Sequence, residues 1–235
     1  MIDPRWIITA AHCFNHHELS DFSIVAGDHY IDRKDPFERE LDPDQVFIHP
    51  SYLPASSRNK SPGDFDVALL HLKTKIVLSP EIHLIRLPNE TTRFPVGHLC
   101  TVSGWGNTVD NFSYNRSNVL RETKVKLVAR DVCNSNVSYG GKIPERFFCA
   151  GYRDGGRDSC YGDSGGPLQC KMSQHEWILV GLVAWGQGCA NSYKYGVYTD
   201  VSEILPFVNT IIDGKQQRFM VRCEILVFLP MPIFT

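Results

Sequence analysis

Short apolar or alternating segments recur along the chain, and clusters of Gly, Pro, Asn and Asp separate them. Alternation of apolar and polar positions is typical of strands with one buried face, and the Gly- and Pro-rich clusters are typical of turns. The pattern predicts strands at residues 23–26, 45–48, 67–72, 99–103, 123–128, 177–185 and 196–199. We therefore expect an all-β fold, either an antiparallel barrel or a sandwich.

One segment has the periodicity of a helix. Its apolar residues, Ile204, Leu205, Val208, Ile211 and Ile212, fall on one face, and Ser202 is a suitable N-cap. This predicts a C-terminal helix over residues 202–212. The composition changes after residue 213, so we expect a domain over residues 1–213 and a short tail over 214–235. Lipid-anchor signal, read-through sequence and the start of a further domain are alternatives for the apolar end of the tail.

The composition limits the classes of protein. The chain has 235 residues, of which 43% are hydrophobic, enough for one large all-β domain or two small ones. A net charge of −2 without a dominant basic cluster argues against nucleic acid as a partner. The longest apolar stretch, residues 225–234, is about half of what a bilayer requires, so no membrane span is expected.

The cysteines and glycosylation motifs indicate an oxidising compartment. Eight cysteines occur without a C-x-x-C pair, which favours disulfides over a zinc ribbon. Acceptor motifs for N-glycosylation begin at Asn89, Asn111, Asn115 and Asn136. These features predict a secreted or extracellular glycoprotein, although the chain opens without a signal peptide.

Three motifs contain a candidate catalytic constellation. His12 lies in "TAAHC", Asp66 in "DFDVALL" and Ser164 in "GDSGGP". Taken singly, these residues are ordinary for a surface, a turn and a loop. Their order along the chain, His then Asp then Ser, is one of the few known for a nucleophilic triad.

With these motifs and several further segments, the chain resembles the chymotrypsin-like, and more specifically the trypsin-like, serine proteases over about residues 6–212. The resemblance includes "SGWG" at 103–106, "FFCAGY" at 147–152, "VAWGQGC" at 183–189 and "YGVYTDV" at 195–201. It implies two six-stranded Greek-key barrels, the first incomplete in this chain, and a C-terminal α-helix.

The resemblance also implies the roles of the catalytic residues. Ser164 would be the nucleophile, and His12 would act as its general base and then as the acid for the leaving amine. Asp66 would orient the imidazole and stabilise its protonated form. The N–H groups of Gly162 and Ser164 would form the oxyanion hole.

Substrate specificity follows from the same resemblance. Asp158 would form the floor of the primary pocket and favour Arg or Lys side chains. Gly186 and Gly196 would keep this pocket open, while Trp185 and Gly186 would offer backbone to the substrate. The implied partners are proteins or peptides with Arg or Lys at the cleavage site, and serine protease inhibitors.

The resemblance pairs six of the eight cysteines: Cys100–Cys170, Cys133–Cys149 and Cys160–Cys189. Cys13 and Cys223 are left over, either bonded to each other or as free or intermolecular thiols. Without the resemblance, eight cysteines permit 105 pairings.

Three positions depart from the family pattern. Ala184 stands where a serine usually donates to the catalytic aspartate, and Tyr161 stands where glutamine is common. Tyr195 occupies a place often held by proline, and relatives with tyrosine there can bind Na⁺. We expect no cofactor, with sodium near Tyr195 as the alternative. A metal site formed by His12, Cys13, His16 and His17 is a further alternative, less favoured because His12 already has a role and no second ligand pair has matching spacing.

The surroundings of Asp163 determine whether this chain is expected to be active. In the family, a freed amino terminus pairs with the aspartate just before the nucleophile, and this chain begins after the corresponding position. The sequence therefore leads us to expect an unpartnered Asp163, missing first strands and weak or absent activity in this chain. The alternative function is a non-catalytic binding module on the same fold.

Overall fold

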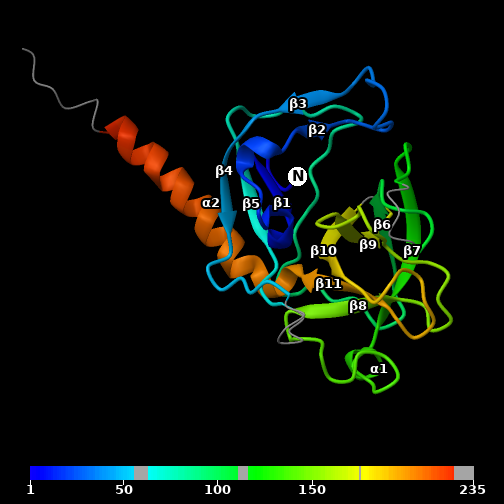
Figure 1. Cartoon of the computed structure of the whole chain (residues 1–235). Helices are drawn as coiled ribbons and strands as arrows, with labels where there is room; N and C mark the ends of the chain where they lie inside the picture. Colours follow the sequence, from blue (N-terminus) through cyan, green and yellow to red (C-terminus); the bar gives the residue numbers. More distant parts are fainter. Residues whose placement is uncertain (56–62, 111–115, 175, 225–235) are drawn as a thin grey trace, which may run out of the picture.

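The computed structural model describes residues 1–55, 63–110, 116–174 and 176–224, with side chains up to residue 215. It has two β-rich halves and a long C-terminal helix that runs away from the body (Figure 1). The second half contains a closed antiparallel barrel in the order β10-β11-β8-β7-β6-β9. Its strands are β6 (Leu99–Gly104), β7 (Arg121–Val128), β8 (Phe147–Gly151), β9 (Pro167–Ser173), β10 (Glu176–Trp185) and β11 (Gly196–Asp200).

The described residues of the first half form smaller sheets. A three-stranded sheet has the order β1-β5-β4, and β2 pairs separately with β3. The bounds are β1 (Trp6–Thr9), β2 (Ile24–Ala26), β3 (Arg39–Leu41), β4 (Pro43–Ile48) and β5 (Ala68–Leu72). Short helical turns occur at η1 (Ala11–Phe14), η2 (Leu19–Asp21) and α1 (Arg130–Cys133). The predicted all-β architecture, with a six-stranded barrel and a C-terminal helix, is confirmed.

The C-terminal helix differs from its prediction at both ends. Helix α2 spans Val201–Glu224. Its N-cap is Asp200 rather than Ser202, because Asp200 Oδ1 accepts hydrogen bonds from the Ser202 N–H at 2.9 Å and from Oγ at 2.6 Å. The helix also continues through Gly214. One glycine costs only about 1 kcal/mol in a helix, and residues 215–218, Lys-Gln-Gln-Arg, are good helix formers.

A shared apolar core joins the two halves to the helix. It combines Trp6, Ile8, Val67 and Leu69 around the first sheet with Leu179 and Leu182 of β10 and with Val201, Ile204 and Val208 of α2. Loops from both halves therefore meet beside a common core, where they hold the candidate catalytic residues. No helix within the described residues is long and apolar enough to cross a membrane.

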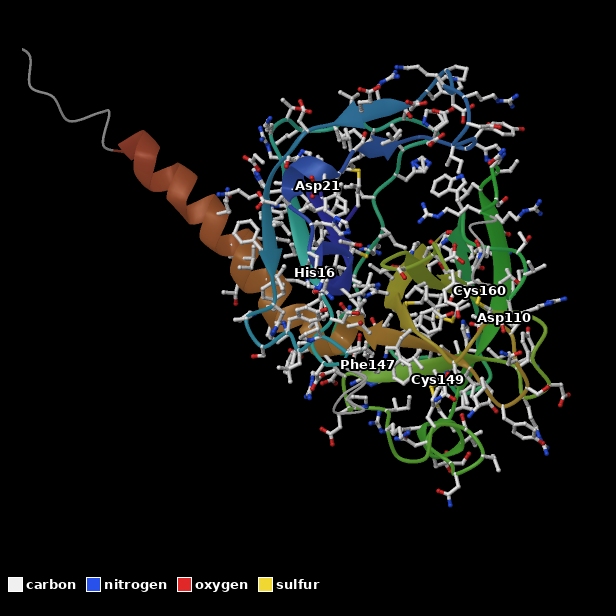
Figure 2. The ribbon with its side chains drawn as sticks, viewed as in Figure 1. His16, Asp21, Asp110, Phe147, Cys149 and Cys160 are labelled. Carbon is white, nitrogen blue, oxygen red and sulfur yellow. A yellow bond between two sulfur atoms is a disulfide. The ribbon has the colours of Figure 1, made fainter. Side chains whose placement is uncertain are left out.

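The disulfides lie in the barrel half. The structure joins Cys100 to Cys170, Cys133 to Cys149 and Cys160 to Cys189, the pairs that the family resemblance implies. Figure 2 shows Cys149 and Cys160 in this half, apart from His16 and Asp21 in the other. Cys13 forms no disulfide within the described part of the chain, and the side chain of Cys223 lies outside it.

Candidate active site

His12 and Asp66 form a close pair in the first half. His12 lies in η1 directly after β1, and Asp66 lies two residues before β5, which pairs with β1. One oxygen of Asp66 accepts a hydrogen bond from His12 Nδ1 at 2.7 Å, and the other accepts one from the His12 backbone N–H at 2.8 Å. A carboxylate at Nδ1 fixes the proton there and leaves Nε2 as the acceptor, the state that a general base requires.

The surroundings change the proton affinity of His12. Burial of the imidazole lowers its pKa, but the hydrogen bonds and negative charges of Asp66 and Cys13 oppose this effect and raise the pKa above its ordinary value overall. Protonated His12 cannot accept a proton from a nucleophile. The arrangement therefore favours base catalysis at the alkaline side of neutrality.

Ser164 comes from the barrel half, in the loop between β8 and β9, and its side chain is exposed. Two contacts join this loop to the first half: Cys13 Sγ lies 3.8 Å from the Ser164 carbonyl oxygen, and Thr9 Oγ1 donates to the Gly165 carbonyl at 3.3 Å. Among the described residues no hydrogen bond joins Ser164 Oγ to His12. Such bonds are often long before substrate binds.

The backbone around Ser164 requires glycine. Gly162 and Gly165 have φ angles of 98° and 73°, in the left-handed region that disfavours residues with a Cβ. A Cβ on Gly165 would lie 2.3 Å from Thr9 Oγ1. In the described part of the chain no group accepts a hydrogen bond from the backbone N–H of Gly162 or of Ser164. An oxyanion hole requires N–H groups that have no acceptor in the free protein.

A cavity of about 240 Å³ adjoins Ser164, and its lining includes Asp158, Trp185, Gly186 and Gly196. These four residues, which the sequence assigns to substrate binding, are thus brought together with Ser164. A Cβ on Gly196 would lie 2.4 Å from Asp158 Oδ1, so a larger residue would obstruct the carboxylate.

Asp158 is partly buried in this cavity. Its oxygens accept hydrogen bonds from the N–H groups of Ser159 at 2.8 Å and Ala190 at 3.1 Å. Burial raises the pKa of Asp158 to about 7, the backbone hydrogen bonds lower it, and the charge of Asp163 raises it further. A cationic side chain in the cavity would restore the preference for the ionised form.

Tyr139 supports the wall of this cavity, and the sequence did not identify it. Its hydroxyl donates to the Tyr195 carbonyl at 2.6 Å and accepts from the Gln187 N–H at 3.4 Å. Its ring packs edge-on against Trp185, with centroids 5.1 Å apart. The tyrosine thus links the strands on either side of Gly186. No linear motif marks such a contact, since 56 positions separate Tyr139 from Tyr195.

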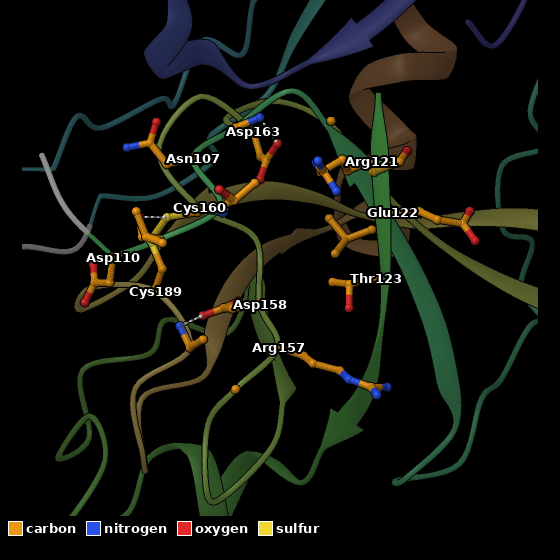
Figure 3. Close-up of a pocket in the computed structure, with 18 residues that line it drawn as sticks. Asn107, Asp110, Arg121, Glu122, Thr123, Arg157, Asp158, Cys160, Asp163 and Cys189 are labelled. Carbon is orange, nitrogen blue, oxygen red and sulfur yellow. Dashed lines mark hydrogen bonds between the residues drawn. A yellow bond between two sulfur atoms is a disulfide. The ribbon is translucent and has the colours of Figure 1, made fainter. Parts of the chain in front are cut away.

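Backbone hydrogen bonds hold the carboxylate of Asp163, and the expectation that it lacks a charged partner stays a prediction. Its two oxygens accept from the N–H groups of Gly106 at 2.8 Å and Cys160 at 2.9 Å, while burial raises its pKa. Figure 3 shows a second cavity, also of about 240 Å³, which Asp158 and Asp163 both line and Ser164 does not. The negative charge of Asp163 is one of the causes that raise the pKa of Asp158.

The remaining candidates have simpler outcomes. Ala184 and Tyr161 line the same cavity as Ser164. Within the described residues no group of three His, Cys, Asp or Glu side chains could hold a metal ion, so the alternative around His12 has no support there. Asn89 and Asn136 are exposed, whereas Asn111 lies outside the described residues, as does Asn115.

Comparisons with known proteins agree with this site. A profile of the Trypsin family matches residues 1–208. Human "Transmembrane protease serine 5" is 40% identical over 212 residues, covering 89% of this chain and 44% of that protein. Human "Hepatocyte growth factor activator serine protease" is 39% identical over 215 residues, covering 89% of this chain and 32% of the relative. "Transmembrane protease serine 9" of Rattus norvegicus is 34% identical over 208 residues, covering 88% of this chain and 19% of that protein.

The chain belongs to the trypsin family of serine proteases, which are serine endopeptidases. It spans less than half the length of each of these relatives.

Proposed function

We propose that this chain is an endopeptidase that cleaves proteins after Arg or Lys through His12, Asp66 and Ser164. The observation that carries the proposal is spatial. His12 and Asp66 form a hydrogen bond of 2.7 Å, the neighbouring Cys13 contacts the backbone of Ser164, and Ser164 lines a cavity that contains the carboxylate of Asp158.

In the proposed reaction, Ser164 Oγ attacks the scissile carbonyl while His12 Nε2 takes its proton. The negative charge that forms on the carbonyl oxygen is held by the N–H groups of Gly162 and Ser164. When the C–N bond breaks, His12 returns the proton to the leaving amine, and an acyl-enzyme remains. Water, deprotonated by His12, then releases the acid and regenerates Ser164.

The proposal also covers the residues that bind the substrate, the secretion of the protein and its inhibition. Asp158 would bind the Arg or Lys side chain at the floor of a cavity kept open by Gly186 and Gly196, and Trp185 would border the substrate backbone. Secretion and inhibition by serine protease inhibitors are supported by the family and by the disulfides. Sodium binding near Tyr195 stays a prediction, checked by comparing rates in NaCl and choline chloride.

Active-site titration tests the proposal directly. A fluorescent phosphonate should label the 235-residue chain stoichiometrically, and Ser164→Ala should abolish labelling. Unlabelled protein from the same preparation, with its active-site concentration set by the titration, should then hydrolyse Arg and Lys peptides faster than matched neutral peptides. A folded chain that takes up no phosphonate would contradict the proposal.

A non-catalytic binding module is the second candidate. It is favoured by Ala184, which cannot donate a side-chain hydrogen bond to Asp66. Its expected result is the opposite one: folded protein, no labelling, and retained binding of an Arg-containing peptide that Asp158→Asn abolishes.

A further inference from the structure

The residues before β5 hold Asp66 in a strained loop. Phe65 has a φ of 50°, in the left-handed region, and its carbonyl oxygen accepts a tight hydrogen bond from the Val67 N–H at 2.8 Å. A large side chain with this backbone conformation is unfavourable and persists only where surrounding contacts determine it. The orientation of Asp66 therefore depends on whatever holds Phe65.

Arg146, which precedes β8 in the barrel half, holds the residue before Phe65. Its Nε donates to Asp64 Oδ1 at 2.7 Å, and its Nη2 donates to the other oxygen of Asp64. Asp64 Oδ1 also accepts from the Phe65 N–H at 2.9 Å. The planar, two-point contact fixes the direction of the carboxylate, which a lysine could not do.

The same guanidinium also covers Phe65. Its Cζ lies 4.2 Å from the centroid of the Phe65 ring. His49 stacks on Phe65 as well, with centroids 4.4 Å apart and an interplanar angle of 15°. The aromatic ring is thus held by groups from both halves of the molecule.

Further hydrogen bonds fix the frame around Asp66. The Thr199 hydroxyl donates to the Asp66 carbonyl at 3.0 Å, and the Asp200 N–H donates to the Arg146 carbonyl at 2.9 Å. Arg146 and Thr199 thereby belong to one hydrogen-bonded unit on the barrel side. Arg146 does not line the cavity that contains Asp158.

We propose that Arg146 is a positioning residue for the catalytic triad, because its contacts with Asp64 and Phe65 keep residues 64–66 in the conformation that directs Asp66 toward His12. The inference rests on the proposed function and adds a residue to it. Arg146 acts through Asp66 and touches neither the substrate cavity nor the reacting atoms.

Arg146→Lys tests the proposal, with Arg130→Lys as the matched control. Arg130 also braces the segment around β8, donating to the carbonyls of Ile143 at 2.6 Å and Phe147 at 3.0 Å. Within the described residues, Arg130 forms no hydrogen bond or ion pair with residues 64–66. Both variants replace an arginine that stabilises the barrel half, so both should lower the melting temperature.

The two variants should differ in catalysis. With rates normalised to titrated active sites, Arg146→Lys should lower kcat for a small Arg substrate about tenfold and leave KM unchanged. It should also lower the pKa of His12, followed by NMR, because a misaligned Asp66 stabilises the imidazolium less. Arg130→Lys should change neither quantity. Unchanged kcat and unchanged His12 pKa in Arg146→Lys would overturn the proposal.

The NMR titration separates this inference from the proposed function. If the parent chain takes up no phosphonate, the proposed function fails, yet the His12 pKa still reports whether Arg146 positions Asp66. If Arg146→Lys does not fold, Asp64→Asn removes the charge of the same pair at nearly constant shape. A lowered His12 pKa in Asp64→Asn supports the proposal, and an unchanged one contradicts it.

Discussion

If Asp158 selects the substrate as proposed, its partly buried carboxylate should make that selection depend on pH. Its pKa is raised to about 7 by burial, so the group is neutral below this pH and charged above it. Only the charged form attracts Arg or Lys. The charged fraction is about 0.9 at pH 8 and about 0.09 at pH 6, a tenfold difference.

The assay compares two substrates that differ in this charge alone. For peptides ending in Arg and in the neutral isostere citrulline, kcat/KM reports the free enzyme. The ionisation of His12 affects both substrates equally and cancels in their ratio. We therefore expect the Arg-to-citrulline ratio of kcat/KM to fall about tenfold between pH 8 and pH 6, with its midpoint near pH 7.

The control is Asp158→Asn, which keeps the shape and removes the titrating group. Its ratio should be low and independent of pH. A carboxylate with an ordinary pKa near 4 would change its charge by only about one per cent over the same range. A constant ratio in the parent enzyme would refute the argument that burial determines the charge of Asp158.

Three further changes have defined outcomes. Tyr139→Phe leaves the buried Tyr195 carbonyl without its 2.6 Å donor. The free energy of unfolding in urea should fall by about 1–3 kcal/mol, and KM for Arg peptides should rise. Unchanged values would contradict the role of Tyr139 in supporting the cavity wall. Ala184→Ser adds the hydroxyl that the family resemblance places beside Asp66. The value of kcat/KM per titrated site should rise about tenfold. No change would show that the existing hydrogen bonds of Asp66 already fix its orientation. Leu69 is 0% exposed in the shared core, and Leu69→Ala should lower the free energy of unfolding in urea by about 2–5 kcal/mol. Leu53 is 58% exposed, and Leu53→Ala should lower it by under about 0.5 kcal/mol. Equal losses would contradict the assigned core.

The long apolar patterns could be predicted as strands from the sequence, whereas the short apolar strands β1 (Trp6–Thr9) and β8 (Phe147–Gly151) and the partly exposed strands β3 and β9 were missed. Residues 67–72 and 177–185 were identified because β5 and most of β10 bury apolar side chains. The short strand β3 (Arg39–Leu41) is largely exposed, and β9 (Pro167–Ser173) ends in exposed residues. Their strand character comes from pairing with neighbours, a non-local property that periodicity does not record.

The helix shows a similar limit at its start. Ser202 has the side chain of a good N-cap, and so does Asp200 two residues earlier. The choice depends on where β11 stops, since Asp200 is its last residue and the helix begins directly afterwards. Local propensity could therefore locate the helix start only to within two residues.

Some residues of the candidate site could be predicted from the sequence, and others could not. Linear motifs identified His12, Asp66, Ser164 and Asp158, because side chains with a direct chemical task occur in short, recognisable segments. Arg146 was missed, since it acts on Asp64 from 82 positions away and its neighbours in the sequence carry no motif. Residues that hold a catalytic group in place become visible only once the chain is folded.

The proposed catalytic geometry depends on the interface between the halves. His12 and Asp66 come from the first half, whereas the barrel half supplies Ser164, so neither half contains a complete triad. The hydrogen bond from Thr9 to Gly165 and the one from Thr199 to Asp66 each cross this interface at a catalytic segment. A small rotation of one half against the other would change the distance between nucleophile and base while leaving both folds intact. Contacts across the interface therefore contribute to activity beyond their contribution to stability.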